Sequence, residues 1–135
     1  MSVRSFAAAT LALILSTCLA HADPLSDLQG AWAIQGSECN DVFSRAGDKT
    51  ELRKRDDDTL PGFIVDGKSV RGIAGTCDVL SAKGQTTKVT LLLSCKSQIM
   101  SSTMTVHLQI TNPMSIVQVD PDFPEVTTNF HKCTM

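Results

Sequence analysis

The chain has 135 residues, and its 12 Lys and Arg against 14 Asp and Glu give a formal net charge of −2 at pH 7. This near-neutral balance argues against a nucleic-acid-binding protein, which would carry a basic excess. The length suffices for one domain with a modest core and is too short for two.

The N-terminal residues have the pattern of a secretory signal peptide. Arg4 precedes an apolar stretch at residues 6–15, and the segment ends in Ala20-His21-Ala22, a small-x-small cleavage site. The apolar stretch is shorter than the roughly 20 residues that a membrane-spanning helix needs. We therefore expect a signal peptide at residues 1–22 and a single β domain at residues 23–135, in a protein that is periplasmic or secreted.

A second interpretation of the leader concerns lipidation. Leu15-Ser16-Thr17-Cys18 loosely resembles a lipobox, in which the cysteine receives a lipid anchor. Thr17 stands where that motif prefers a smaller residue, so cleavage after Ala22 is favoured. Whether Cys18 is lipidated instead stays open.

The cysteines indicate the compartment. Cleavage after Ala22 removes Cys18 and leaves four cysteines, Cys39, Cys77, Cys95 and Cys133. An even number of cysteines in a small exported domain indicates two disulfides formed in an oxidising environment.

The predicted elements, taken in chain order, are almost all strands. Residues 31–34 form the first strand, and Asp41-Val42-Phe43 is either a short strand or one helical turn. A polar, exposed strand follows at residues 49–55. Residues 63–70 predict a hairpin, because Asp66-Gly67 between β-forming residues favours a two-residue type I′ turn.

Apolar alternation is clearest in the second half of the chain. Met104, Val106, Leu108 and Ile110 alternate with polar residues, which gives the period of two that is typical of a half-buried strand. The other predicted segments are a strand near residues 73–80, a turn at Lys83-Gly84-Gln85, a strand around residues 89–93, a turn at Asn112-Pro113, a strand at residues 115–119, a loop at residues 120–124 and a final strand at residues 126–133.

The sequence contains about eight short predicted strands and little evidence for helix. This pattern predicts an all-β fold, a small antiparallel barrel or sandwich that is cross-linked by two disulfides. Cys77 and Cys95 flank the predicted turn at Gly84 and can face each other across one hairpin. Cys39 follows the first strand and Cys133 ends the last, and these two strands are neighbours in a closed meander. Four cysteines allow three pairings, of which we favour Cys77–Cys95 with Cys39–Cys133.

Acidic residues and histidines form no strong catalytic or metal-binding motif. Asp56-Asp57-Asp58 lacks the alternating ligands, the glycine and the distal Glu of a calcium loop, so we interpret it as a solvated loop. Asp120 and Asp122 are interpreted as turn residues. His107 and His131 would hold zinc only if the strands brought them together, and the cysteines lack a Cys-x-x-Cys pair.

The sequence also lacks the Gly-x-Ser-x-Gly motif of a nucleophile elbow. A cysteine nucleophile would leave one structural thiol without a partner. We therefore expect no enzyme activity, no cofactor and no bound metal.

One short motif carries a family resemblance. Gly30-Ala31-Trp32 is similar to the Gly-x-Trp at the start of lipocalins, in which the tryptophan packs across the base of an eight-stranded barrel. The resemblance implies that Trp32 is a core aromatic residue that seals one barrel end.

The pattern from Leu28 to Trp32, followed by Cys39, also resembles the opening of small periplasmic metalloprotease inhibitors, which are disulfide-bearing barrels. Those inhibitors have two cysteines where this chain has four after cleavage. In that family the N-terminal segment enters the protease cleft, which implies partner contacts here for Asp23, Pro24, Leu25, Ser26, Asp27 and Leu28. As a whole, the chain is similar to uncharacterised small exported four-cysteine proteins of Gram-negative bacteria, a resemblance that implies no activity.

These observations predict a non-catalytic binding or inhibitory module that acts on a protein partner in the cell envelope or outside it. One alternative is a lipocalin-like barrel for a small apolar ligand, and others are an envelope structural protein or a hydrolase. The partner hypothesis ranks first because aromatic residues are few and the interior is expected to be filled by Phe63, Val89, Leu91, Met104 and Leu108. Whether Leu92 and Ile99-Met100 form an exposed apolar patch stays open.

Overall fold

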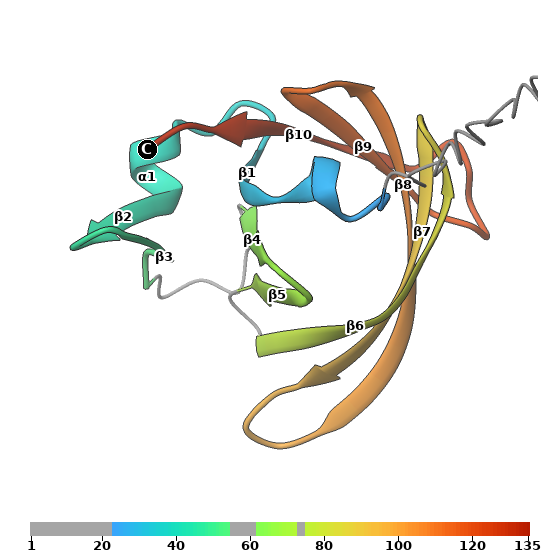
Figure 1. Ribbon diagram of the computed structural model, residues 1–135, viewed down its shortest axis with the longest axis horizontal. Coiled ribbons are helices and arrows are strands. Elements are labelled where there is room, and N and C mark those ends of the chain that lie inside the picture. The colour runs from blue at the N-terminus through green and yellow to red at the C-terminus, as the bar shows by residue number, and fades with distance from the viewer. Residues whose placement is uncertain (1–22, 55–61, 73–74) are drawn as a thin grey trace, which may run out of the picture.

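The computed structural model describes residues 23–54, 62–72 and 75–135. Within them, eight antiparallel strands close into a barrel, and a separate two-stranded hairpin lies beside it (Figure 1). This arrangement confirms the predicted all-β class and decides for the barrel against the sandwich. The predicted signal peptide and Asp56-Asp57-Asp58 lie outside the described residues. In the described part of the chain, no helix is long and apolar enough to cross a membrane.

The barrel strands follow one another around the circumference. They are β1 (Gly30–Ile34), β4 (Gly62–Asp66), β5 (Ser69–Gly72), β6 (Gly75–Gln85), β7 (Lys88–Lys96), β8 (Ser101–Asn112), β9 (Ser115–Val119) and β10 (Thr127–Cys133). Each strand from β4 to β10 pairs with the next, and the ring closes because β1 pairs with both β10 and β4. Closure gives every barrel strand two neighbours, so its backbone groups are paired on both sides.

The longest strands, β6, β7 and β8, form the curved wall at the right of Figure 1. In β7, the buried residues Val89, Leu91 and Leu93 alternate with the half-buried Thr90 and Leu92. The predicted period of two is therefore present, with the apolar row facing inward.

The connection between β1 and β4 packs against the outside of the barrel, at the left of Figure 1. It contains α1 (Cys39–Val42), β2 (Phe43–Ala46) and β3 (Lys49–Leu52). Val42 and Phe43 are buried in a cluster with Ala31, Ala33 and Ile64. The small alanines on the outer face of β1 leave room for the Phe43 ring. Both predicted alternatives for residues 41–43 are therefore present: Asp41 and Val42 end the helical turn, and Phe43 begins the strand.

Both predicted disulfides are present. Cys77 lies directly opposite Cys95 across the β6–β7 pair. The Cys39–Cys133 disulfide joins α1 to the end of β10, with a Cα–Cα distance of 5.7 Å. The closure argument holds because Ala31 of the first strand pairs with Cys133 of the last strand.

The turn between β4 and β5 differs by one residue from the prediction. Asp66 pairs with Ser69, so the two turn residues are Gly67 and Lys68. In the described residues only glycines have positive φ, and Gly67 has a φ of 59°. A type I′ turn needs positive φ at both central residues, whereas a type II′ turn needs it only at the first. The type I′ prediction is therefore wrong.

The turn predicted at Lys83-Gly84-Gln85 is also wrong. β6 continues through Gln85, which pairs with Lys88, so Thr86 and Thr87 form the turn. Gly84 lies within the strand with a φ of 146°, and a Cβ there would collide with the Lys88 carbonyl oxygen. Glycine marks a close approach of two backbones at this position rather than a turn. The turn predicted at Asn112-Pro113 is formed one residue later, by Pro113 and Met114, because Asn112 pairs with Ser115. The loop at residues 120–124 agrees with the prediction.

Candidate binding cavity

The barrel contains a cavity with a volume of about 1100 Å³. Side chains from the inner faces of several strands form its wall, and most of them are aliphatic, aromatic or sulfur-containing. They include Phe63, Val65, Val70, Cys77, Leu91, Leu93, Cys95, Met104, Val106, Leu108 and Phe130. A concave surface of this composition is suited to binding an apolar molecule.

The cross-strand register of β7 and β8 makes one side of this wall continuous. Leu91 pairs with Val106, and Leu93 pairs with Met104. Directly opposite residues of antiparallel strands share one face of the sheet, so these pairs form an unbroken apolar surface inside the barrel. Elsewhere in the wall, Phe63 and Phe130 meet edge to face, with ring centroids 5.1 Å apart.

The segment before β1 closes one end of the barrel. It contains the short 3₁₀ helix η1 (Ser26–Leu28), drawn in blue across the ring of strands in Figure 1. Leu28 is fully buried and lines the cavity. The Gln29 side chain holds the segment to the β4–β5 turn, because its Nε2 donates to the Gly67 carbonyl oxygen and its Oε1 accepts from the Gly67 N–H.

The opposite end of the barrel forms the mouth of the cavity. Strand direction alternates, so the β7–β8 connection lies at the other end from the β4–β5 turn. Its residues line the cavity, and two of them, Ile99 and Met100, are 91% and 64% exposed. Lys96 lies beside them and is the one charged residue among the described lining residues. The mouth therefore combines apolar side chains with a cation.

The interior is hollow toward the mouth, where the sequence predicted that it would be filled, while side chains deeper in the barrel such as Leu28 and Leu108 are buried in the core. Phe63, Leu91, Met104 and Leu108 line the cavity, while Val89 is buried in the adjoining core. The prediction placed these side chains on the correct face, but they do not fill the part of the interior that opens at the mouth. Alternation along a strand identifies the inward face and contains no information on how far opposite walls are apart.

The six residues predicted to contact a protein partner belong to the closing segment. Leu25 and Leu28 are buried in the barrel core, and Pro24 is half-buried. Asp23, Ser26 and Asp27 are exposed. The apolar half of this segment therefore packs on the barrel, and only its polar half faces solvent.

Trp32 lies next to the closing segment and is fully buried. Its Nε1–H donates a hydrogen bond of 2.8 Å to the Leu28 carbonyl oxygen. The Lys132 Nζ, from the residue that pairs with Trp32 on β10, lies 5.3 Å from the ring centroid, within the range of a cation–π contact. Trp32 thus connects the N-terminal segment to the barrel wall.

The two histidines and the acidic candidates among the described residues do not converge with one another. His107 pairs with Val119 and His131 with Ser115, so the two histidines lie beside opposite ends of β9. The Asp120 carboxylate accepts hydrogen bonds from the backbone N–H groups of Asp122 and Phe123, which is a turn-forming role.

Sequence reasoning assigned neither the Cys77–Cys95 disulfide nor Lys96 to a binding site, and it left open whether Ile99 and Met100 are exposed. Cys77 and Cys95 contribute to its wall, and Ile99 and Met100 lie at its mouth, close in the chain to Lys96. The apolar Ile99-Met100 pair between two long strands was the available signal, and the structure shows that both side chains are exposed. Leu92 is half-buried on the outer face of β7.

Comparisons with known proteins give no relative: no protein-family model matches the chain, and no curated protein or solved structure is significantly similar to it.

Proposed function

We propose that this chain is an exported, non-catalytic binding protein that holds one small apolar molecule inside its barrel. The observation that carries the proposal is the cavity of about 1100 Å³ with its apolar wall. Ligand pockets typically have volumes of about 300–1000 Å³ and bury most of a small ligand. Eight-stranded barrels have an interior wide enough to hold one such molecule.

The driving force for binding is the removal of apolar ligand surface from water. Each 100 Å² removed contributes roughly 2.5 kcal/mol before the costs of association are subtracted. Leu91, Leu93 and Val106 offer aliphatic groups to a ligand, and groups of this kind bind water poorly. The cavity therefore favours a molecule with a hydrocarbon body.

The mouth supports a ligand with one polar end. Lys96, Ser97 and Gln98 lie at the rim and present a cation and hydrogen-bonding groups near solvent. An amphiphile with its hydrocarbon part inside and a polar or anionic group at the rim satisfies both parts of the cavity. The rim cation favours a carboxylate or a similar anion.

Binding or inhibition of a protein partner is the second candidate function. Asp23, Ser26 and Asp27 are exposed and available to a partner, which keeps this candidate open. Leu25 and Leu28 are buried against the barrel, so the segment would have to detach before its apolar side chains entered a protease cleft. This packing supports ranking ligand binding above inhibition.

The proposed location is the periplasm or the outside of the cell. Two disulfides support it, because disulfides form and persist in oxidising compartments. The signal-peptide pattern of the N-terminal residues gives independent support from the sequence.

Displacement of a polarity-sensitive fluorescent dye by apolar molecules tests the proposal, with native mass spectrometry to detect a co-purifying molecule. Leu93→Trp places an indole in the cavity wall and should weaken dye binding at least tenfold. Leu92→Trp makes the same change on the adjacent outward-facing residue and should leave binding within twofold. The proposal is overturned if the native protein binds neither dye nor ligand one to one, or if both variants weaken binding equally.

A further inference from the structure

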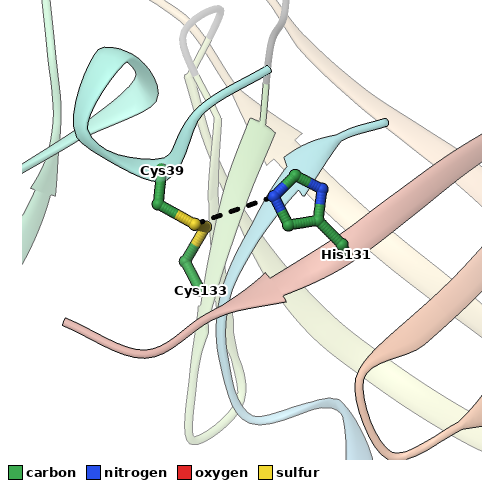
Figure 2. Close-up of a disulfide and its surroundings, with 3 residues drawn as sticks. All are labelled: Cys39, His131 and Cys133. Atoms are coloured by element: carbon green, nitrogen blue, oxygen red, sulfur yellow. Dashed lines mark hydrogen bonds between the residues drawn. A yellow bond between two sulfur atoms is a disulfide. The ribbon is translucent and has the colours of Figure 1, made fainter. Parts of the chain in front are cut away.

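We propose that Cys39, Cys133 and His131 form a metal site for a thiophilic d¹⁰ ion, Zn²⁺ or Cu⁺, when the two cysteines are in their dithiol form. The site lies outside the barrel, at the disulfide that joins α1 to β10 (Figure 2). The inference goes beyond the proposed ligand-binding function and does not depend on it.

The fold brings the three donor groups together from distant parts of the chain. His131 and Cys133 are two residues apart on β10 and therefore share one face of the strand. Cys39 reaches the same face from α1, and Figure 2 shows the His131 ring directed at its sulfur. The Nε2–Sγ distance between His131 and Cys39 is 3.7 Å, and the three donor atoms all lie within 4.8 Å of one another.

The distance from His131 to Cys39 fits a tetrahedral metal centre, and reduction of the disulfide lets the two bonded sulfurs move apart to the spacing of two metal ligands. Metal–sulfur bonds of about 2.3 Å and metal–nitrogen bonds of about 2.0–2.1 Å place a sulfur and a nitrogen ligand about 3.5 Å apart. The His131–Cys39 distance is already close to that value. Two thiolates and one imidazole are donors that both Zn²⁺ and Cu⁺ prefer. Cys39 and His131 are half-buried, so solvent can supply a fourth ligand to Zn²⁺.

A dithiol reductant can convert the Cys39–Cys133 disulfide into two free thiols in two exchange steps. One reductant thiolate attacks the sulfur of Cys39, the less buried of the two residues, and Cys133 leaves as a thiolate. The second thiol of the reductant then displaces Cys39, so two electrons pass to the protein and the reductant becomes a cyclic disulfide. Metal binding replaces the two thiol protons, which are released to solvent, and transfers no electron. A newly exported chain reaches the same dithiol state before its first oxidation.

The second cysteine pair provides an internal control. In the described part of the chain, the only group of three or more possible His, Cys, Asp or Glu ligands is the one that contains His131. Cys77 and Cys95 therefore offer two thiolates without a third ligand of these types. Any difference in metal affinity between the two pairs measures the contribution of the arrangement around His131.

Metal titration of reduced full-length variants, all of which also carry Cys18→Ala so that only the two cysteine pairs remain, tests the proposal in competition with a chromophoric chelator, with Zn²⁺ and Cu⁺ in separate arms. The Cys77→Ala/Cys95→Ala variant keeps the proposed site and should bind one ion per chain. The Cys39→Ala/Cys133→Ala variant keeps only the other pair and should bind at least tenfold more weakly. His131→Ala, added to the first variant, should weaken binding at least tenfold, whereas His107→Ala should have no effect. The arm with the higher affinity identifies the metal.

A measurement on the wild-type chain covers the case in which the variants do not fold. The reduced chain is reoxidised with and without each metal, and the free thiols are alkylated over time and mapped by mass spectrometry. Metal should slow formation of Cys39–Cys133 more than formation of Cys77–Cys95, and His131→Ala should abolish the difference. Equal affinities of the two cysteine pairs, an unchanged affinity in His131→Ala, or no selective protection in the wild type overturns the proposal.

Discussion

The Trp32 indole nitrogen donates a hydrogen bond to the Leu28 carbonyl oxygen, at 2.8 Å, inside the barrel end that the N-terminal segment closes. Both residues are fully buried. The bond therefore satisfies two polar groups that solvent does not reach, and it connects the chain before β1 to the wall of the barrel.

Trp32→Phe tests the contribution of this bond. The phenyl ring keeps much of the apolar contact but leaves the buried Leu28 carbonyl without its partner, which should cost about 1–3 kcal/mol in the free energy of unfolding. Urea denaturation measures the change. Phe123→Leu, at a residue that is 59% exposed, should stay within about 0.5 kcal/mol. A loss in Trp32→Phe as small as the loss in Phe123→Leu would contradict the assigned role.

The two disulfides should differ in their contribution to stability. Cys39–Cys133 spans 94 residues and Cys77–Cys95 spans 18. The loop-entropy relation gives about 4.7 and about 3.2 kcal/mol for loops of these lengths, because the longer crosslink restricts the unfolded chain more. Replacing each pair by alanines and comparing denaturant midpoints should show about 1.5 kcal/mol greater loss for the longer crosslink. An equal or reversed order would show that effects on the folded state dominate.

Gly62→Ala should destabilise the junction between the barrel and the hairpin of β2 and β3. A Cβ at Gly62 would collide with the Trp32 carbonyl oxygen and lie 2.9 Å from a Val42 methyl group. Forcing an extra carbon into packed structure typically costs about 1–3 kcal/mol. Thermal unfolding followed by circular dichroism measures the loss.

Gly67→Asn is the control for this substitution. Gly67 has a φ of 59°, which strains any residue with a side chain but asparagine less than most, and nothing lies within 4 Å of the position that a Cβ would take there. The control introduces backbone strain without a collision. The control should therefore lose less stability than Gly62→Ala. If Gly62→Ala unfolds at the wild-type temperature, the packing described at this junction is wrong.

Lys96→Glu should discriminate between ligands by charge. If an amphiphile binds with its polar end at the mouth, reversal of the rim charge weakens a carboxylate such as dodecanoate about two- to fivefold, a modest effect because the rim is exposed to solvent. The uncharged dodecanol should bind as it does to the wild type. Lys88→Glu makes the same change at the opposite end of β7 and should leave both affinities unchanged. Equal effects on the two probes would place the polar end of the ligand elsewhere.

The sequence alone predicted most of the strands and a barrel-compatible meander, and it favoured the disulfide pairing that the structure contains. Alternation in residues such as Met104, Val106 and Leu108 is local and predicts which side chains face inward. The positions of Cys39 and Cys133 beside the first and last strands were sufficient to pair them once the meander was assumed to close. The turn predicted at Gly84 was wrong because glycine serves both turns and close backbone contacts, and the residue type does not distinguish these uses. The turn at Gly67 was misplaced by one residue because Asp-Gly and Gly-Lys both suit a two-residue hairpin turn.

Only the tertiary structure decided that the interior is hollow, that Leu25 and Leu28 close it, and that His131 lies beside Cys39. Each of these features depends on distances between segments far apart in the chain. Those distances follow from the number of strands in the ring and from the register between them, which local patterns do not encode. The sequence therefore determined which residues face inward, and the closure of the ring determined how much space lies between them.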